Sequence, residues 1–189
     1  MGNRALSAAV QYISMSMPKL LAETYFKYAL LMAADEDNNA FAEPAKLKAL
    51  LTLASHIDVY TNESDFAMLL SSLANLHLPL GWFGPADFGE LPSKVVWIDC
   101  SDVGATYENN ADSDWGHQYF RNSPAVTADV HQVLDGVPPD KVKPRLPDRV
   151  FPNRKFVIRL MSTVFGHAQE ATRHLVEGGP LSRSRQQVQ

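Results

Sequence analysis

The chain has 189 residues, of which 46 % are hydrophobic and 20 % charged, the balance of a globular domain with a core of its own. Its net charge of −4 does not favour binding to nucleic acid or to an anionic membrane surface. The single cysteine, Cys100, excludes an internal disulfide, and no apolar run of about 18 residues predicts a membrane span.

The charge is distributed unevenly along the chain. Residues 1–136 contain 7 basic and 17 acidic side chains, whereas residues 137–189 contain 10 basic and 4 acidic ones. The second part is also interrupted by several prolines. We therefore expect a folded domain over residues 1–136, followed by a basic, Pro-rich and partly disordered tail over residues 137–189.

Apolar patterns predict helices that alternate with short strands. Apolar residues at helical spacing predict a helix over 3–16, which Pro18 ends. A strand follows at 25–32, then a helix at 43–55, a strand at 56–60, a helix at 66–76, a loop at 78–93, a strand at 95–100, a polar loop at 101–118 and a helix near Pro124. Residues 156–165 are a candidate for one further element and residues 167–176 for a short helix.

Alternation of this kind is typical of an α/β fold with a parallel sheet that helices cover on both faces. The pattern predicts three strands. A three-stranded parallel sheet has two bare edges, which proteins generally avoid. We therefore expect further sheet on the N-terminal side of Met1, so that the three strands are the last part of a truncated sheet.

Two candidate catalytic residues follow strand ends. Asp65 lies just beyond the second predicted strand, and His117 lies beyond the third. Open parallel sheets build their sites at the carboxyl ends of strands. An acid that precedes a histidine is the chain order of the α/β-hydrolase triad, in which the nucleophile comes first.

The start of the chain fits the end of a nucleophile elbow. In G-x-S-x-G the serine lies on a sharp turn between a strand and a helix, and a small residue lets the turn close. Met1 and Gly2, followed at once by a predicted helix, match the last two positions of that motif. The serine itself is not in the chain.

Residues 1–136 resemble the C-terminal half of a bacterial α/β-hydrolase family of unknown function in the esterase/lipase superfamily. The matching residues are Met1-Gly2-Asn3-Arg4, Ala34-Asp35, Val59-Tyr60 through Asp65, Leu80-Gly81 with Gly84-Pro85, Ile98-Asp99-Cys100-Ser101, Gly116-His117-Gln118-Tyr119-Phe120, Asp129 and Leu134-Asp135-Gly136. In the family, Gly-His-Ser would precede the residue that corresponds to Met1.

The resemblance implies a role for each of these positions. His117 would be the general base and then the general acid, and Asp65 would hold its ring in the correct tautomer. The backbone N–H of Met1 would be one oxyanion donor, and Gly2 is the remnant of the elbow. The parent activity would be serine-dependent hydrolysis of a small ester or related acyl substrate, and we expect the chain to be inactive without its N-terminal half.

Alternatives remain at each position. Asp35 is a rival acid, because some hydrolases place the acid after the preceding strand. In a purely structural interpretation, Asp65 caps a helix and Asp35 belongs to a turn. Ser7 and Ser101 do not occupy the elbow, and Cys100 is expected to be a buried thiol.

A second hypothesis is not enzymatic. The chain would then be a remnant or pseudo-enzyme half-fold, with its open sheet edge covered by a partner chain or by a second copy in a homodimer. No metal or cofactor is expected: the acidic run at 35–39 has Ala40 where a calcium loop needs Gly and Lys46 where it needs Glu. No signal segment appears in the sequence given, which leaves a cytoplasmic location as the default and the true location open.

Overall fold

The computed structural model describes residues 2–104 and 116–159, and Met1, residues 105–115 and residues 160–189 lie outside the description. The described residues belong to one compact unit that ends at Arg159. The boundary predicted after residue 136 falls inside this unit. The helix predicted at 167–176 lies outside the described residues.

The centre of the unit is a five-stranded sheet. Its strands are β1 (Phe26–Met32), β2 (Ala54–Thr61), β3 (Val95–Asp99), β4 (Arg145–Pro147) and β5 (Lys155–Ile158), in the spatial order β1-β2-β3-β5-β4. Neighbouring strands are parallel except β4 and β5, which are antiparallel. The α/β class is therefore confirmed, whereas the expectation of only three parallel strands is wrong. β5 covers the start of the element predicted at 156–165, of which residues 160–165 lie outside the described residues. β4 was not predicted.

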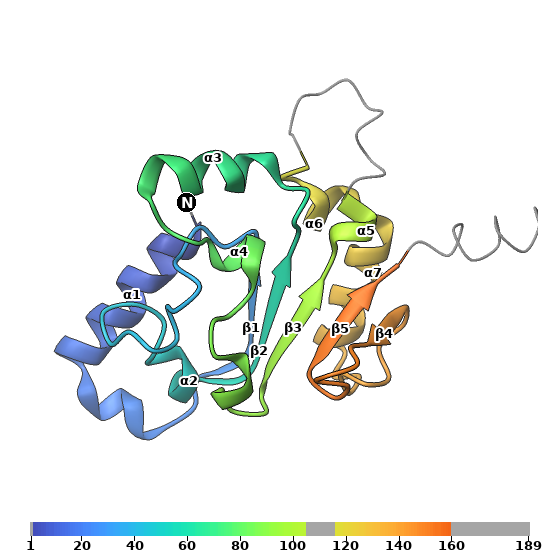
Figure 1. The fold of residues 1–189 in the computed structure, drawn as a ribbon. Coiled ribbons are helices and arrows are strands. Elements are labelled where there is room, and N and C mark those ends of the chain that lie inside the picture. Colours follow the sequence, from blue (N-terminus) through green and yellow to red (C-terminus); the bar gives the residue numbers. More distant parts are fainter. Residues whose placement is uncertain (1, 105–115, 160–189) are drawn as a thin grey trace, which may run out of the picture. The chain divides into compact units, whose positions relative to one another are not determined.

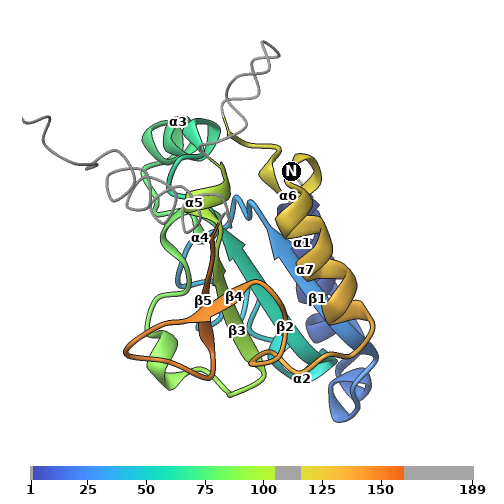
Figure 2. The ribbon, with the colours of Figure 1, turned by 90° about the vertical axis from the view of Figure 1, so that its right-hand side faces the viewer.

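Two long helices cover opposite faces of the sheet. They are α1 (Gly2–Ser16) and α7 (Pro124–Leu134), with α7 in front of the strands and α1 behind them in Figure 2. Successive side chains of β2 point to opposite faces of the sheet, so the strand contacts both helices. Ile57 and Val59 join the apolar core to which Val10 of α1 belongs, whereas the Tyr60 hydroxyl bonds Asp129 of α7.

Several short elements connect the strands. They are the 3₁₀ turns at Pro18–Ala22 and Phe88–Glu90, and the helices α2 (Leu50–Leu53), α3 (Phe66–Asn75), α4 (Leu80–Phe83), α5 (Ser101–Gly104) and α6 (Tyr119–Asn122). Figure 1 shows α3, α5 and α6 at the end toward which the arrows of β2 and β3 point. This carboxyl edge is where parallel sheets carry their sites.

The helix predicted at 43–55 is wrong. Residues 44–49 form successive turns, only Leu50–Leu53 is helical, and β2 already begins at Ala54. A bond from the amide of Leu47 to the carbonyl of Ala40 closes the turns, and both side chains are fully buried. Core packing thus overrides the helical spacing of the apolar residues. Likewise, the loop predicted at 78–93 contains α4 and a 3₁₀ turn.

Within residues 2–104 and 116–159, no helix has both the length and the apolar character that a membrane crossing needs.

Candidate active site

Asp65 directly precedes α3 and lies four residues after the end of β2. It is the N-cap of this helix: its Oδ1 accepts a hydrogen bond of 3.0 Å from the amide of Met68. The residue is completely buried. The structural role proposed for Asp65 from the sequence is therefore present, and it uses only one of the two carboxylate oxygens.

The second oxygen contacts the candidate base. Nδ1 of His117 lies 2.8 Å from Oδ2 of Asp65. The side chain of His117 is 34 % exposed, whereas that of Asp65 is not exposed. An Nδ1–H that donates to the carboxylate fixes the neutral ring in the tautomer whose Nε2 carries the lone pair. This is the form that a general base requires.

Tyr119 fastens the segment that follows His117 to the sheet. Its hydroxyl donates to the carbonyl of Tyr60 at 2.9 Å and accepts the amide of Ala33 at 3.2 Å. These two partners lie at the carboxyl ends of β2 and β1. Burial raises the pKa of the Tyr119 hydroxyl well above its ordinary value, so the proton needed for the first bond stays in place.

The rival acid, Asp35, has different neighbours. Its Oδ1 accepts the hydroxyl of Ser71 at 2.6 Å and lies 3.5 Å from Nε2 of His77, and its Oδ2 lies 3.0 Å from Nε of Arg4. The structure thus brings His117 together with Asp65 and gives Asp35 to a separate polar cluster.

Beside the Asp35 cluster lies a cavity of about 410 Å³ with mostly polar walls. Its lining includes Arg4, Glu36 and Lys46 but neither Asp65 nor His117. This cavity is therefore no part of the acid–histidine pair's surroundings.

The start of α1 lies at the same sheet edge as the pair. The side-chain amide of Asn3 donates to the carbonyl of Met32, the last residue of β1, at 3.1 Å. Nε of Arg4 donates to the carbonyl of Asp35 at 3.0 Å. Met1, the predicted oxyanion donor, lies outside the described residues, and a Cβ on Gly2 would meet open space.

The remaining nucleophile candidates have structural surroundings. The hydroxyl of Ser101 donates to Asp99 at 2.6 Å and accepts the amide of Glu63 at 3.0 Å. Ser7 is buried within α1. Cys100 is completely buried, and this burial raises the pKa of its thiol well above the ordinary value. The protonated thiol is a poor nucleophile.

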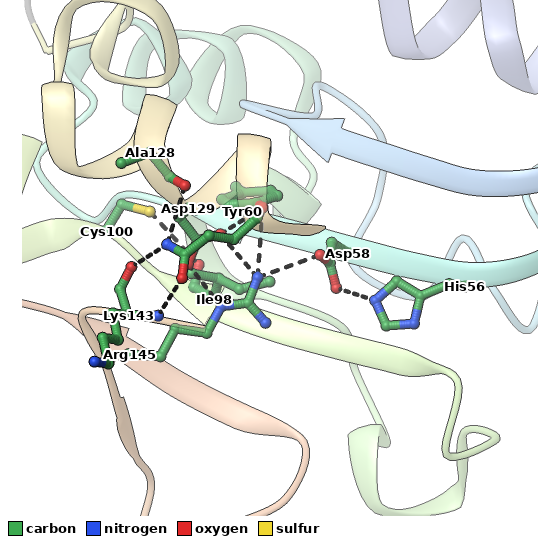
Figure 3. Close-up of polar contacts among 10 residues, drawn as sticks. His56, Asp58, Tyr60, Ile98, Cys100, Ala128, Asp129, Lys143 and Arg145 are labelled. Atoms are coloured by element: carbon green, nitrogen blue, oxygen red, sulfur yellow. Dashed lines mark hydrogen bonds and ion pairs between the residues drawn. The ribbon is translucent and has the colours of Figure 1, made fainter. Parts of the chain in front are cut away.

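A buried ion cluster lies on the α7 face of the sheet (Figure 3). Arg145 of β4 pairs with both oxygens of Asp129, through Nε at 2.6 Å and Nη2 at 2.8 Å. Nη2 also lies 3.3 Å from Asp58 of β2, whose other oxygen contacts Nε2 of His56 at 2.8 Å. The hydroxyl of Tyr60 donates to Asp129 at 2.7 Å. The cluster ties β2, β4 and α7 together.

The electrostatics of the cluster keep Arg145 charged. Burial lowers the pKa of its guanidinium, but the hydrogen bonds to Asp129 and the charge of Asp58 outweigh it and raise the pKa overall. Burial raises the pKa of Tyr60, so its hydroxyl remains a donor. Sequence reasoning missed this cluster because it assigned Arg145 to a tail.

No group of three or more His, Cys, Asp or Glu side chains in the described part of the chain is arranged to hold a metal ion. Comparison of the chain with protein-family models, with curated proteins and with solved structures found no match. The candidate site therefore rests on the geometry of Asp65 and His117.

Proposed function

We propose that Asp65 and His117 are the acid and the base of a serine-type hydrolase that cleaves an ester or related acyl bond. The observation that carries the proposal is the 2.8 Å contact between Nδ1 of His117 and Oδ2 of the buried Asp65. In this proposal, the nucleophile is a serine upstream of Met1, on the segment that leads into α1.

Each residue would have a separate chemical task. His117 would take the proton of the serine hydroxyl through Nε2 and then give it to the leaving alkoxide. Asp65 would keep the imidazole in one tautomer and stabilise the imidazolium as it forms. The backbone N–H of residue 1, in a chain that continues upstream, would donate to the oxyanion.

The position of α1 supports this assignment. Asn3 and Arg4 hold the first turn of the helix against the carboxyl end of β1 and the residues after it. Asp65 and His117 follow the carboxyl ends of β2 and β3, the next two strands of the parallel sheet. A residue immediately before α1 would therefore enter at the edge that carries the acid and the base.

The DNA upstream of the Met1 codon provides the first test. We expect an in-frame reading that ends in Gly-His-Ser. The protein from the longer reading should react with a fluorophosphonate probe at that serine, and His117→Ala should abolish the labelling. His131→Ala, which removes an exposed histidine from α7, is the matched control and should label normally.

The 189-residue chain alone should not react with the probe. Labelling at a serine within residues 1–189 would show that we have placed the nucleophile wrongly. A longer protein that contains the serine but neither labels nor hydrolyses p-nitrophenyl esters would contradict the proposed activity itself.

A second candidate function is the non-catalytic binding of a partner chain. It is favoured by the position of β1 at one edge of the sheet, where Tyr25 is 49 % and Phe26 43 % exposed. Light scattering after size-exclusion chromatography tests it. A folded monomer at micromolar concentration would contradict the need for a second copy.

A further inference from the structure

Asn62, to which sequence reasoning assigned no role in the site, is completely buried directly after β2. Both ends of its side-chain amide are bonded. Nδ2 donates to the carbonyl of Gly116 at 3.1 Å, and Oδ1 accepts the amide of Ser64 at 2.9 Å. The side chain therefore joins the turn before Asp65 to the residue before His117.

The turn at 62–65 is fixed from several directions. The amide of Asn62 donates to the carbonyl of Gly81, and the amide of Asp65 donates to the carbonyl of Asn62. Nε1 of Trp82 donates to the carbonyl of Glu63 at 2.7 Å, and the Glu63 amide donates to Ser101. The turn that carries Asp65 is thus hydrogen-bonded to both α4 and α5.

The segment that carries His117 packs directly against the turn at 62–65. Gly116 has a φ of +77°, and a Cβ there would approach the carbonyl oxygen of Ser64 to 2.8 Å. Only glycine allows both the backbone conformation and this close approach. The bond from Asn62 to the Gly116 carbonyl fastens the segment at the residue adjacent to the base.

We propose that Asn62 is a positioning residue: its amide holds the His117 segment on the Asp65 turn at the distance that the Asp65–His117 hydrogen bond needs. The importance of Asn62 for catalysis rests on the proposed function. Its effect on the Asp65–His117 hydrogen bond does not. Misplacement of a catalytic group by about 1 Å can cost about 10²-fold in rate, so a bond of this kind matters well beyond its own strength.

The test uses Asn62→Asp in the 189-residue chain. The variant keeps the acceptor for Ser64 but replaces the donor with a carboxylate that faces the Gly116 carbonyl. NMR of the imidazole of His117 gives the readout. In the unmodified chain we expect a low-field Nδ1–H resonance and ¹⁵N shifts of the Nδ1–H tautomer, both of which Asp65→Asn should remove and thereby assign.

In Asn62→Asp we expect the low-field resonance to disappear and the tautomers to mix, while far-UV circular dichroism stays unchanged. Asn153→Asp, at an exposed asparagine, is the matched control and should retain the resonance. A folded Asn62→Asp variant with the unmodified resonance would overturn the proposal. If Asn62 only stabilised the fold, Asn62→Asp would lower the free energy of unfolding without changing the His117 signal of the folded molecules, which would also contradict the proposal.

Gly116→Ala is the second variant, in case Asn62→Asp does not fold. It leaves Asn62 intact but strains the other end of the bond, and it should also remove the resonance. If neither variant folds, the bond is a requirement of the fold and the positioning proposal is wrong. Failure of the proposed function is distinguishable, because the His117 signals would then be normal while the longer protein fails to react with the probe.

Discussion

Asp65 makes a different interaction with each of its carboxylate oxygens. Oδ1 caps α3 through the amide of Met68, and Oδ2 contacts Nδ1 of His117. The structural and the catalytic interpretations of this residue are therefore compatible. Substitutions that differ in one interaction only can separate them.

We expect Asp65→Ala to lower the free energy of unfolding by about 0.5–2 kcal/mol more than Asp65→Asn, because asparagine is a good N-cap and alanine is not. Both variants should lose the low-field Nδ1–H resonance of His117, since neither has a carboxylate. Urea denaturation and the NMR measurement check the two effects separately. Equal destabilisation by the two substitutions would mean that the cap contributes little.

Sequence reasoning located the pair but not what holds it in place. The order of strand, Asp65, strand and His117 is readable because strand periodicity and chain order are local features. The bonds of Asn62 and Tyr119 join residues 54 and 59 positions apart, respectively. Gly116 was noted as part of a motif, but its contact with Ser64 requires the folded chain.

At the scale of elements, the strands with continuous apolar runs were predictable and the short edge strand was not. β1, β2 and β3 coincide with the predicted strands to within two residues at each end. β4 has three residues, Arg145–Pro147, of which two are exposed. Its sequence has no strand periodicity, and its pairing depends on β5 and on the ion cluster.

The carboxylate of Asp148 contacts three residues of the turn between β4 and β5 and of β5 itself. Its Oδ1 accepts the amides of Val150 and Phe151 at 2.8 and 3.0 Å, and its Oδ2 lies 3.8 Å from Nζ of Lys155. The hydrogen bond from Phe151 is the main cause that lowers the pKa of this carboxyl below its ordinary value, and the bond from Val150 contributes as well. Burial opposes them.

A carboxyl whose pKa is lower in the folded than in the unfolded chain stabilises the native state. Its contribution is complete at pH values above the unfolded pKa of about 3.9. It is lost as the pH falls through the lower pKa of the folded chain. We therefore expect Asp148→Asn to be less stable than the unmodified chain at neutral pH, by an amount that shrinks below about pH 4. Urea denaturation over a pH series measures the difference. A difference that does not change with pH would contradict a role for the charge.

At the scale of the whole described unit, the ion cluster joins residues on both sides of position 136. Asp58 and Asp129 are completely buried and belong to the part predicted to be the domain, whereas Arg145 belongs to the part predicted to be a tail. A domain that ended at residue 136 would bury two carboxylates without their cation. Burial of unpaired charge is costly, so the segment with β4 and β5 has to fold with the rest.

Arg145→Met tests this conclusion in the full chain. The substitution puts an apolar side chain in place of the guanidinium, so that Asp58 keeps only His56 and Asp129 only the hydroxyl of Tyr60. Removal of one member of a buried ion pair typically costs about 3–5 kcal/mol. We expect a loss of that size in the free energy of unfolding, measured by urea denaturation in one cooperative transition. Arg149→Met, at an exposed arginine four residues away, should change it by no more than about 0.5 kcal/mol. If the two variants were equally stable, the cluster would contribute nothing to joining residues 137–159 to the sheet, and the pairing of β5 with β3 would have to do so alone.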